Sequence, residues 1–201
     1  MNAYSGTMKR IFFYGVISFL IGMGGIQAED SIKQIRKWYG EIQNDKNLKK
    51  QTFKDGEGDG GGEFELTRYT TAKGELRKIH RYGGGDHGVG NETYYFRGGK
   101  LFFVYITSQY WRFTGEKDPN GESEVIDIAS QLRLYFKDGK CIKALEKRIA
   151  IKGADELRQL LDKQPNKPKE IDDELHSYEN RAKQLAAIKS KEDLMKYLSQ
   201  P

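Results

Sequence analysis

The sequence predicts an α+β fold with an N-terminal helix, a curved antiparallel meander of about six strands, and two or three C-terminal helices. Apolar residues recur at helical spacing after residue 31 and again after residue 153. Between these segments, β-branched and aromatic residues form short runs that glycine turns separate, which is typical of antiparallel strands. A chain of 201 residues is long enough for one domain preceded by a short targeting segment.

The first 28 residues have the order of a secretory signal. Basic residues at 9–10 precede an apolar stretch over 11–26, and Ala28 stands directly before acidic residues. We expect cleavage after Ala28, which leaves 29–201 as an exported domain, either periplasmic or secreted. The alternative is a retained anchor, but the apolar core is shorter than the ~20 residues that span a bilayer. We therefore expect no stable transmembrane anchor after cleavage.

The charges are mixed along the chain. Loss of residues 9–10 lowers the formal net charge of +5 by two units, and basic residues are interspersed with acidic ones almost throughout. A nucleic-acid-binding protein usually concentrates its basic residues on one face, so we expect no nucleic acid partner. Cys141 is the single cysteine, which excludes an intramolecular disulfide and predicts a half-buried structural thiol.

A capping box predicts the start of the N-terminal helix. Ser31 is followed three residues later by Gln34, and apolar residues then recur at helical spacing. We therefore predict a helix over 31–44, within an N-terminal segment of 29–53. Residues 54–62 contain too much glycine for a regular element and predict a mobile loop.

The central segment, 63–151, predicts an antiparallel sheet. Two of its turns, Gly98-Gly99 and Asp138-Gly139, carry the residues that favour the positive φ angles of tight hairpins. The predicted strands are 63–71, 75–82, 92–97, 100–112, 123–137 and 140–151.

The C-terminal segment, 153–201, predicts helices. A short helix is expected to end near Lys163, because the proline-containing linker 164–169 cannot continue it. Two helices follow, over 170–188 and 191–199, the second with a cap at Ser190 to Asp193. In one interpretation these helices pack on the sheet, and in the other they form a docking arm for a partner or a dimer.

Parts of the strand region resemble a known family. The resembling motifs are Leu76-Arg77-Lys78-Ile79, Asn91 to Phe96, Gly99 to Tyr105, Gln131 to Phe136, and Gly139-Lys140. They resemble a family of exported bacterial β-rich proteins of uncharacterised function, over roughly residues 63–145. The resemblance implies a periplasmic or secreted scaffold and carries over no catalytic residues.

One cluster of side chains suggests a zinc site. His80, Asp86, His87 and Glu92 surround a glycine-rich turn, and a hairpin at this turn would bring His80 and Glu92 toward the loop. Imidazole and carboxylate ligands of this kind suit zinc. The alternative is a flexible surface turn, in which Asp and His tolerate unusual backbone angles.

A calcium loop is a second metal hypothesis. Asp55, Glu57 and Asp59 occupy the first, third and fifth positions of a calcium-binding pattern, with Gly60 at the sixth. The twelfth position is Leu66, which lacks the usual bidentate carboxylate. The alternative is a solvated acidic loop.

A dense aromatic tract on two predicted strands suggests a ligand-binding surface. Alternation along a strand directs about half of these rings into the core, and the others would form a stacking surface for sugars or an anionic polymer. The candidate ligand-binding residues are Tyr94, Tyr105, Tyr110, Trp111 and Arg112. The alternative is ordinary core packing of all these rings.

No catalytic signature is present in the sequence, so we predict no catalytic residue and no cofactor, with calcium or zinc as the alternatives. The function that fits best is a non-enzymatic envelope or secreted module with a binding or structural role, whose partner is an envelope protein or a glycan. One alternative is a metal-dependent, hydrolase-like enzyme that uses the cluster around His80. Another is a protein that docks a partner or dimerises through its C-terminal helices.

Overall fold

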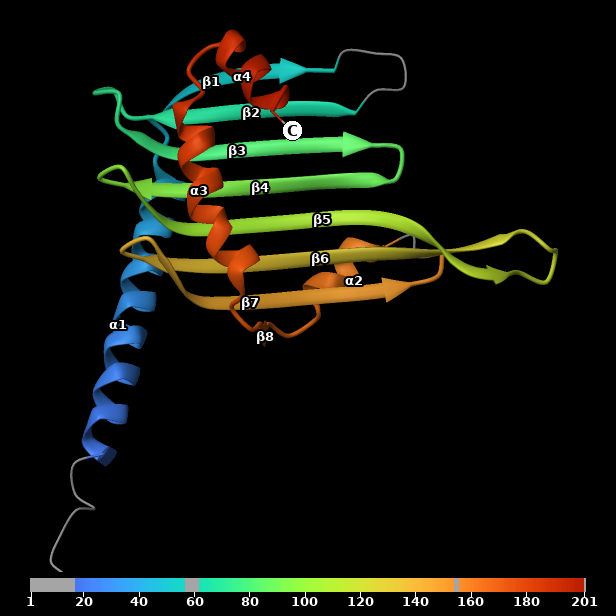
Figure 1. The fold of residues 1–201 in the computed structure, drawn as a ribbon, viewed down its shortest axis with the longest axis horizontal. Coiled ribbons are helices and arrows are strands. Elements are labelled where there is room, and N and C mark those ends of the chain that lie inside the picture. Colours follow the sequence, from blue (N-terminus) through green and yellow to red (C-terminus); the bar gives the residue numbers. More distant parts are fainter. Residues whose placement is uncertain (1–16, 57–61, 154–155, 201) are drawn as a thin grey trace, which may run out of the picture.

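The protein has the predicted α+β fold (Figure 1). The computed structural model describes residues 17–56, 62–153 and 156–200, with side chains described from Glu29 onward. A helix leads into one eight-stranded sheet, and helices follow it.

The sheet is an antiparallel meander in which every strand pairs with its sequence neighbour. Short hairpins produce this order from β2 to β7, because a tight turn returns the chain beside the strand it has just left, whereas the connection from β7 to β8 contains α2 (Leu157–Asp162). The strands are β1 (Lys49–Asp55), β2 (Glu63–Thr70), β3 (Leu76–Gly85), β4 (Gly88–Arg97), β5 (Lys100–Lys117), β6 (Ser123–Lys137), β7 (Lys140–Ile151) and β8 (Lys167–Pro168).

Two strands lie outside the six that the sequence predicts. β1 begins in the segment assigned to the N-terminal helix and extends into the first two residues of the predicted loop 54–62, and β8 falls in the proline linker. β1 forms one edge of the sheet, and its first four side chains are all exposed, so it lacks the alternation of a half-buried strand. Lysines on an edge strand oppose pairing with another chain, which explains its polar sequence.

The two predicted hairpin corners are confirmed. Gly98 and Gly99 have φ angles of 56° and 73°, and Asp138 and Gly139 have φ angles of 48° and 79°. Positive φ at both central residues matches the twist of the flanking strands.

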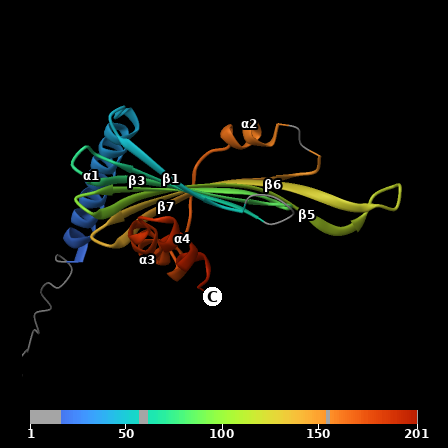
Figure 2. The ribbon, with the colours of Figure 1, turned by 90° about the horizontal axis from the view of Figure 1, so that it is seen from above.

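Helices cover both faces of the sheet (Figure 2). α1 (Ile17–Asn44) and α2 (Leu157–Asp162) lie on one face, which we call the α1 face, and α3 (Asp173–Ala187) and α4 (Lys191–Leu198) lie on the other. On the α1 face, helix residues such as Ile32 and Ile35 pack against Phe102 and Phe103.

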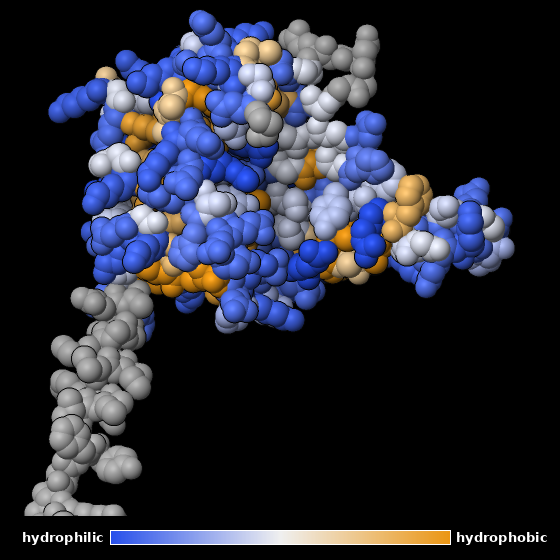
Figure 3. Space-filling model, in the orientation of Figure 1, coloured by the Kyte–Doolittle hydropathy of each residue, from blue (hydrophilic) through white to orange (hydrophobic). Residues whose placement is uncertain are grey.

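The α3 face holds the larger core. α3 and α4 bury their apolar stripe against β2 to β7, and Arg68, only 8% exposed, donates from Nη1 to the carbonyl oxygens of Ala186 at 2.8 Å and Ile188 at 2.6 Å. A cation is favourable at this position because the C-terminus of a helix carries partial negative charge. The outer surface of these helices is largely hydrophilic, as Figure 3 shows for this face.

The helix boundaries differ in part from the prediction. α1 begins at Ile17, so Ser31 lies inside the helix instead of capping it. The cap before α4 is confirmed, since Ser190 Oγ accepts from the Asp193 backbone nitrogen at 3.1 Å and Asp193 Oδ2 accepts from that of Ser190 at 3.0 Å. Among the described residues, no helix has both the length and the hydropathy needed to cross a membrane.

Candidate functional site

The four residues of the zinc hypothesis do not converge. His80 lies on the α1 face, where its Nδ1 is 3.2 Å from Thr93 Oγ1. Glu92 lies on the α3 face and accepts from Arg81 at 2.8 Å and from Arg181 at 3.2 Å. The prediction that His80 and Glu92 approach each other is therefore wrong. His80 pairs with Thr93, and Glu92, the residue before Thr93, points to the opposite face because successive residues of a strand alternate.

The other two zinc candidates contribute to local packing. The His87 ring lies 4.3 Å from the Trp111 ring, and Trp111 Nε1 donates to the backbone oxygen of Asp86 at 3.2 Å. No group of three or more His, Cys, Asp or Glu side chains with a metal-binding arrangement exists within the described part of the chain. Of the three calcium candidates, only Asp55 lies in the described part of the chain, at the end of β1 opposite Phe64. Glu57 and Asp59 lie outside the described residues.

The five aromatic-tract candidates divide between the two faces of the sheet. Tyr94 is fully buried on the α3 face, and Tyr110 and Arg112 lie on the same face farther along β5. Tyr105 and Trp111 lie on the α1 face. These residues therefore do not form one stacking surface.

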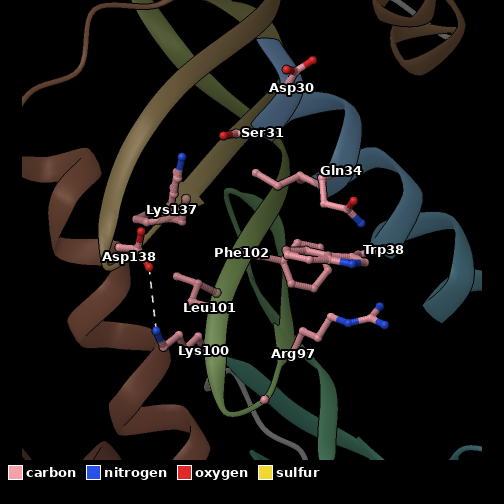
Figure 4. Close-up of a pocket in the computed structure, with 13 residues that line it drawn as sticks. Asp30, Ser31, Gln34, Trp38, Arg97, Lys100, Leu101, Phe102, Lys137 and Asp138 are labelled. Carbon is pink, nitrogen blue, oxygen red and sulfur yellow. Dashed lines mark ion pairs between the residues drawn. The ribbon is translucent and has the colours of Figure 1, made fainter. Parts of the chain in front are cut away.

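A large cavity lies at one end of the sheet, between α1 and the hairpin turns at 97–100 and 137–140 (Figure 4). Its volume is about 550 Å³, and Trp38 and Phe102 form an apolar wall in which the two ring centroids are 5.5 Å apart. Most of its charges are already neutralised: Arg97 pairs with Glu41 at 2.5 Å, and Lys100 pairs with Asp138 at 3.7 Å.

The α1 face has a second hollowed region, between α1 and α2. Two adjacent hollows of about 340 and 310 Å³ share Tyr39 and Tyr105, and a smaller hollow of about 70 Å³ lies against α2. We call this surface the tyrosine face. It is defined by Arg36, Tyr39, Tyr69, Lys78, His80, Thr93, Tyr95, Tyr105, Arg133, Tyr135 and Arg158.

A row of hydrogen-bonding side chains crosses the tyrosine face at right angles to the strands. The strand register places one residue of each of six neighbouring strands opposite the next. The row is Thr52, Thr67, His80, Thr93, Tyr105 and Arg133.

The charged side chains that line these three hollows are all basic. They are Arg36, Lys78, Arg133 and Arg158, and no aspartate or glutamate lines any of the three. None of the four takes part in an ion pair found among the described residues. Arg133 instead donates to the neutral amide oxygens of Asn166 and Gln131, the latter at 3.0 Å. The tyrosine face is therefore electropositive within a surface of mixed charge.

The tyrosine rings of this surface are packed against neighbours. Lys78 Nζ lies 4.1 Å from the centroid of the Tyr69 ring, and Arg133 Cζ lies 5.3 Å from that of Tyr105. Tyr39 meets Tyr95 edge to face at 5.1 Å. The face consequently offers hydroxyl, ammonium and guanidinium donors to a ligand more than open ring surfaces.

Burial adjusts the ionisation of these donors. It raises the pKa of Tyr69 and Tyr105, so both hydroxyls stay protonated and able to donate at neutral pH. It lowers the pKa of Lys78, an effect that the nearby charge of Lys50 reinforces. An anion bound beside Lys78 would reverse this shift, because it stabilises the ammonium form.

Cys141 lies away from this surface, in the core of the α3 face. It is 6% exposed and thus more buried than predicted, and burial raises the pKa of its thiol. A thiol that stays protonated is a poor nucleophile, so Cys141 has the expected structural role.

Sequence reasoning did not identify Lys78 and Arg133 as candidate site residues, although alternation offered a signal. Polar residues occupy every second position at 78 and 80 in β3 and at 131 and 133 in β6. Alternate residues of a strand share one face of the sheet. The register that aligns these positions across β3 to β6 becomes visible only in the assembled sheet.

His80 gives this surface an expected pH dependence. Burial lowers its pKa from an ordinary value of 6.5, an effect that Glu65 opposes and that Lys78 and Lys50 reinforce. A histidine whose folded-state pKa is lowered contributes stability above its unfolded pKa, and this stability is lost as the pH falls below about 6.5. We expect the melting temperature of the wild type to fall more between about pH 7.5 and 5.5 than that of His80→Gln. The control is His176→Gln on the exposed surface of α3, and parallel melting curves for wild type and His80→Gln would contradict the assignment.

Comparison of the chain with protein families, with curated proteins and with solved structures found no match. The resemblance to the exported β-rich family therefore stays a prediction.

Proposed function

We propose that this protein is an exported, non-enzymatic binding module of the cell envelope or the secreted fraction, and that it binds a glycan on the tyrosine face. The observation that carries the proposal is the open stretch of sheet between α1 and α2, with its two larger hollows joined at Tyr39 and Tyr105. Concave surfaces with convergent polar groups are the usual places for ligands.

The side chains of this surface suit an oxygen-rich ligand. The part of the row from His80 to Arg133 presents imidazole, hydroxyl and guanidinium groups on four neighbouring strands, and sugar hydroxyls both donate and accept hydrogen bonds. Because these groups stand on paired strands, their spacing is fixed before a ligand arrives, which lowers the entropic cost of binding.

A binding role is favoured over catalysis by the partners of the titratable groups. His80 contacts Thr93, and no carboxylate lies within hydrogen-bonding distance of its ring among the described residues. Glu92, one of the two carboxylates of the hydrolase hypothesis, lies on the opposite face between two arginines.

The test is a binding measurement with Tyr105→Ala. Titration calorimetry with a panel of neutral and acidic oligosaccharides should show binding to the wild type and a loss of about tenfold or more in Tyr105→Ala, because Tyr105 lines both larger hollows and its hydroxyl is a donor of the site. The matched control is Tyr110→Ala, which alters another half-buried tyrosine of β5, on the opposite face beside Arg148. Equal affinities in Tyr105→Ala and the wild type, or no binding of any oligosaccharide, would reject the proposal.

A further inference from the structure

We infer that the ligand of the tyrosine face is an acidic glycan, an oligosaccharide that carries carboxylate, sulfate or phosphate groups. This inference rests on the proposed function and specifies the chemistry of its ligand.

The charge of the surface carries the inference. Arg36, Lys78, Arg133 and Arg158 come from α1, β3, β6 and α2, and no carboxylate neutralises any of them within the described part of the chain. Lys78 and Arg133 are half-buried, and a half-buried cation without an anionic partner costs free energy that a bound anion recovers; Arg36 and Arg158 are exposed and add attraction for the same anion. Other half-buried cations of the sheet have such a partner, as Arg77 has in Glu75 and Arg81 has in Glu92.

Two carboxylates near this surface are occupied elsewhere. Asp162 accepts from Gln131 Nε2 at 3.0 Å, and Glu65 pairs with Lys54 at 3.0 Å and accepts from Thr67. Neither lines the hollows, so the field inside them is dominated by the four basic side chains.

The spacing of the cations indicates an extended ligand. Lys78 on β3 and Arg133 on β6 are separated by three strand intervals, or about 14 Å across the sheet at the usual ~4.8 Å between strands, and by a further two residues along the strands. Arg36 and Arg158 stand on the helices at the two sides of the same surface. A ligand that meets several of these side chains carries repeated negative charges along a chain, as an acidic oligosaccharide does.

The packing of the tyrosines separates this ligand from single-stranded nucleic acid. Proteins bind unpaired bases by stacking them on open aromatic faces. Lys78 and Arg133 already lie over the rings of Tyr69 and Tyr105, and Tyr39 packs edge to face with Tyr95, so donors to oxygen atoms dominate. Acidic sugars, with oxygen atoms on every ring, match this arrangement.

The experiment compares a hexamer of galacturonic acid with its uncharged galactose counterpart, by titration calorimetry on the full protein. We expect the acidic hexamer to bind at least about tenfold more tightly, and this preference to shrink as salt is raised, because charge-assisted contacts are screened. Lys78→Met and Arg133→Gln should each weaken binding of the acidic hexamer by about tenfold and weaken binding of the neutral hexamer clearly less, because only the acidic hexamer loses a charge-assisted contact. Arg112→Gln, an exposed arginine on the opposite face of the sheet, is the control and should have no effect.

The possible results separate the two proposals. Equal binding of the two hexamers overturns the acidic-glycan inference and leaves the glycan-binding function standing. Binding of neither hexamer, nor of any sulfated or phosphorylated oligosaccharide, overturns both. Tighter binding of a single-stranded oligonucleotide or a glutamate-rich peptide overturns the inference in favour of that polymer. A melting temperature of Lys78→Met equal to or above that of the wild type confirms that any loss of binding is not loss of fold.

Discussion

Deletion of residues 165–201 is expected to abolish cooperative thermal unfolding. The deleted segment contributes Leu175, Leu185, Ile188 and Leu194 to the main core, each at most 2% exposed. Burial of one such side chain stabilises a protein by roughly 1.5–3 kcal/mol, and a typical domain has a total stability of about 5–15 kcal/mol. Loss of all four therefore removes most of the stability and exposes the apolar surface of β2 to β7. Calorimetry should show no unfolding peak.

The control for this deletion removes only residues 199–201, which follow α4. Ser199 and Gln200 are exposed, so this shorter deletion should leave the melting temperature within about 2 °C of the wild type, as surface changes usually do. A melting temperature for the long deletion close to that of the full chain would instead support the alternative that α3 and α4 form a docking arm.

Glu92→Ala is expected to lower the free energy of unfolding by about 3 kcal/mol, the lower end of the range for a broken buried ion pair. Glu92 is 7% exposed and accepts hydrogen bonds from Arg81, Arg181 and the Tyr94 hydroxyl. Its removal leaves two guanidinium groups facing each other without an anion. We expect the lower end of this range because the Arg181 side chain is 39% exposed, so water partly solvates its charge when Glu92 is removed.

Urea denaturation measures this effect, and the melting temperature should fall by about 6–12 °C for a domain of this size. Glu124→Ala is the matched control, since the partner of Glu124, Lys152, is 57% exposed at a distance of 2.6 Å. An ion pair with an exposed partner contributes about 1 kcal/mol or less. The structure indicates that Glu92 joins α3 to the sheet. Equal losses of unfolding free energy in the two variants would contradict this role.

Local chemistry explains the parts of the fold that the sequence predicts. The turns at 98–99 and 138–139 require positive φ angles that only a few residue types adopt readily, and the cap at Ser190 needs partners three residues apart. Such signals lie within a few residues of each other. β1 and β8 carry no such signal, because edge strands are defined by the neighbour that they join and not by their own pattern.

The candidate site is less predictable because it depends on strand register. His80 and Glu92 are near each other in sequence, but the pairing of His80 with Thr93 sends their side chains to opposite faces. Tyr105 and Arg133 are far apart in sequence, yet the register places them directly opposite each other. A one-residue shift in the pairing of β3 with β4, or of β5 with β6, would send the side chains of the tyrosine face to different faces of the sheet. The sequence alone does not determine which register forms.

The order of the strands also has a kinetic consequence. From β2 to β7, each strand pairs with the one before it across a short turn, so this part of the sheet grows by closing short hairpins, and each closure costs little loop entropy. Docking of the α3 C-terminus is different, because the contact of Arg68 with Ile188 joins residues 120 positions apart. We therefore expect the strands to assemble early and the α3 face to close late, which makes that closure the rate-limiting step of folding.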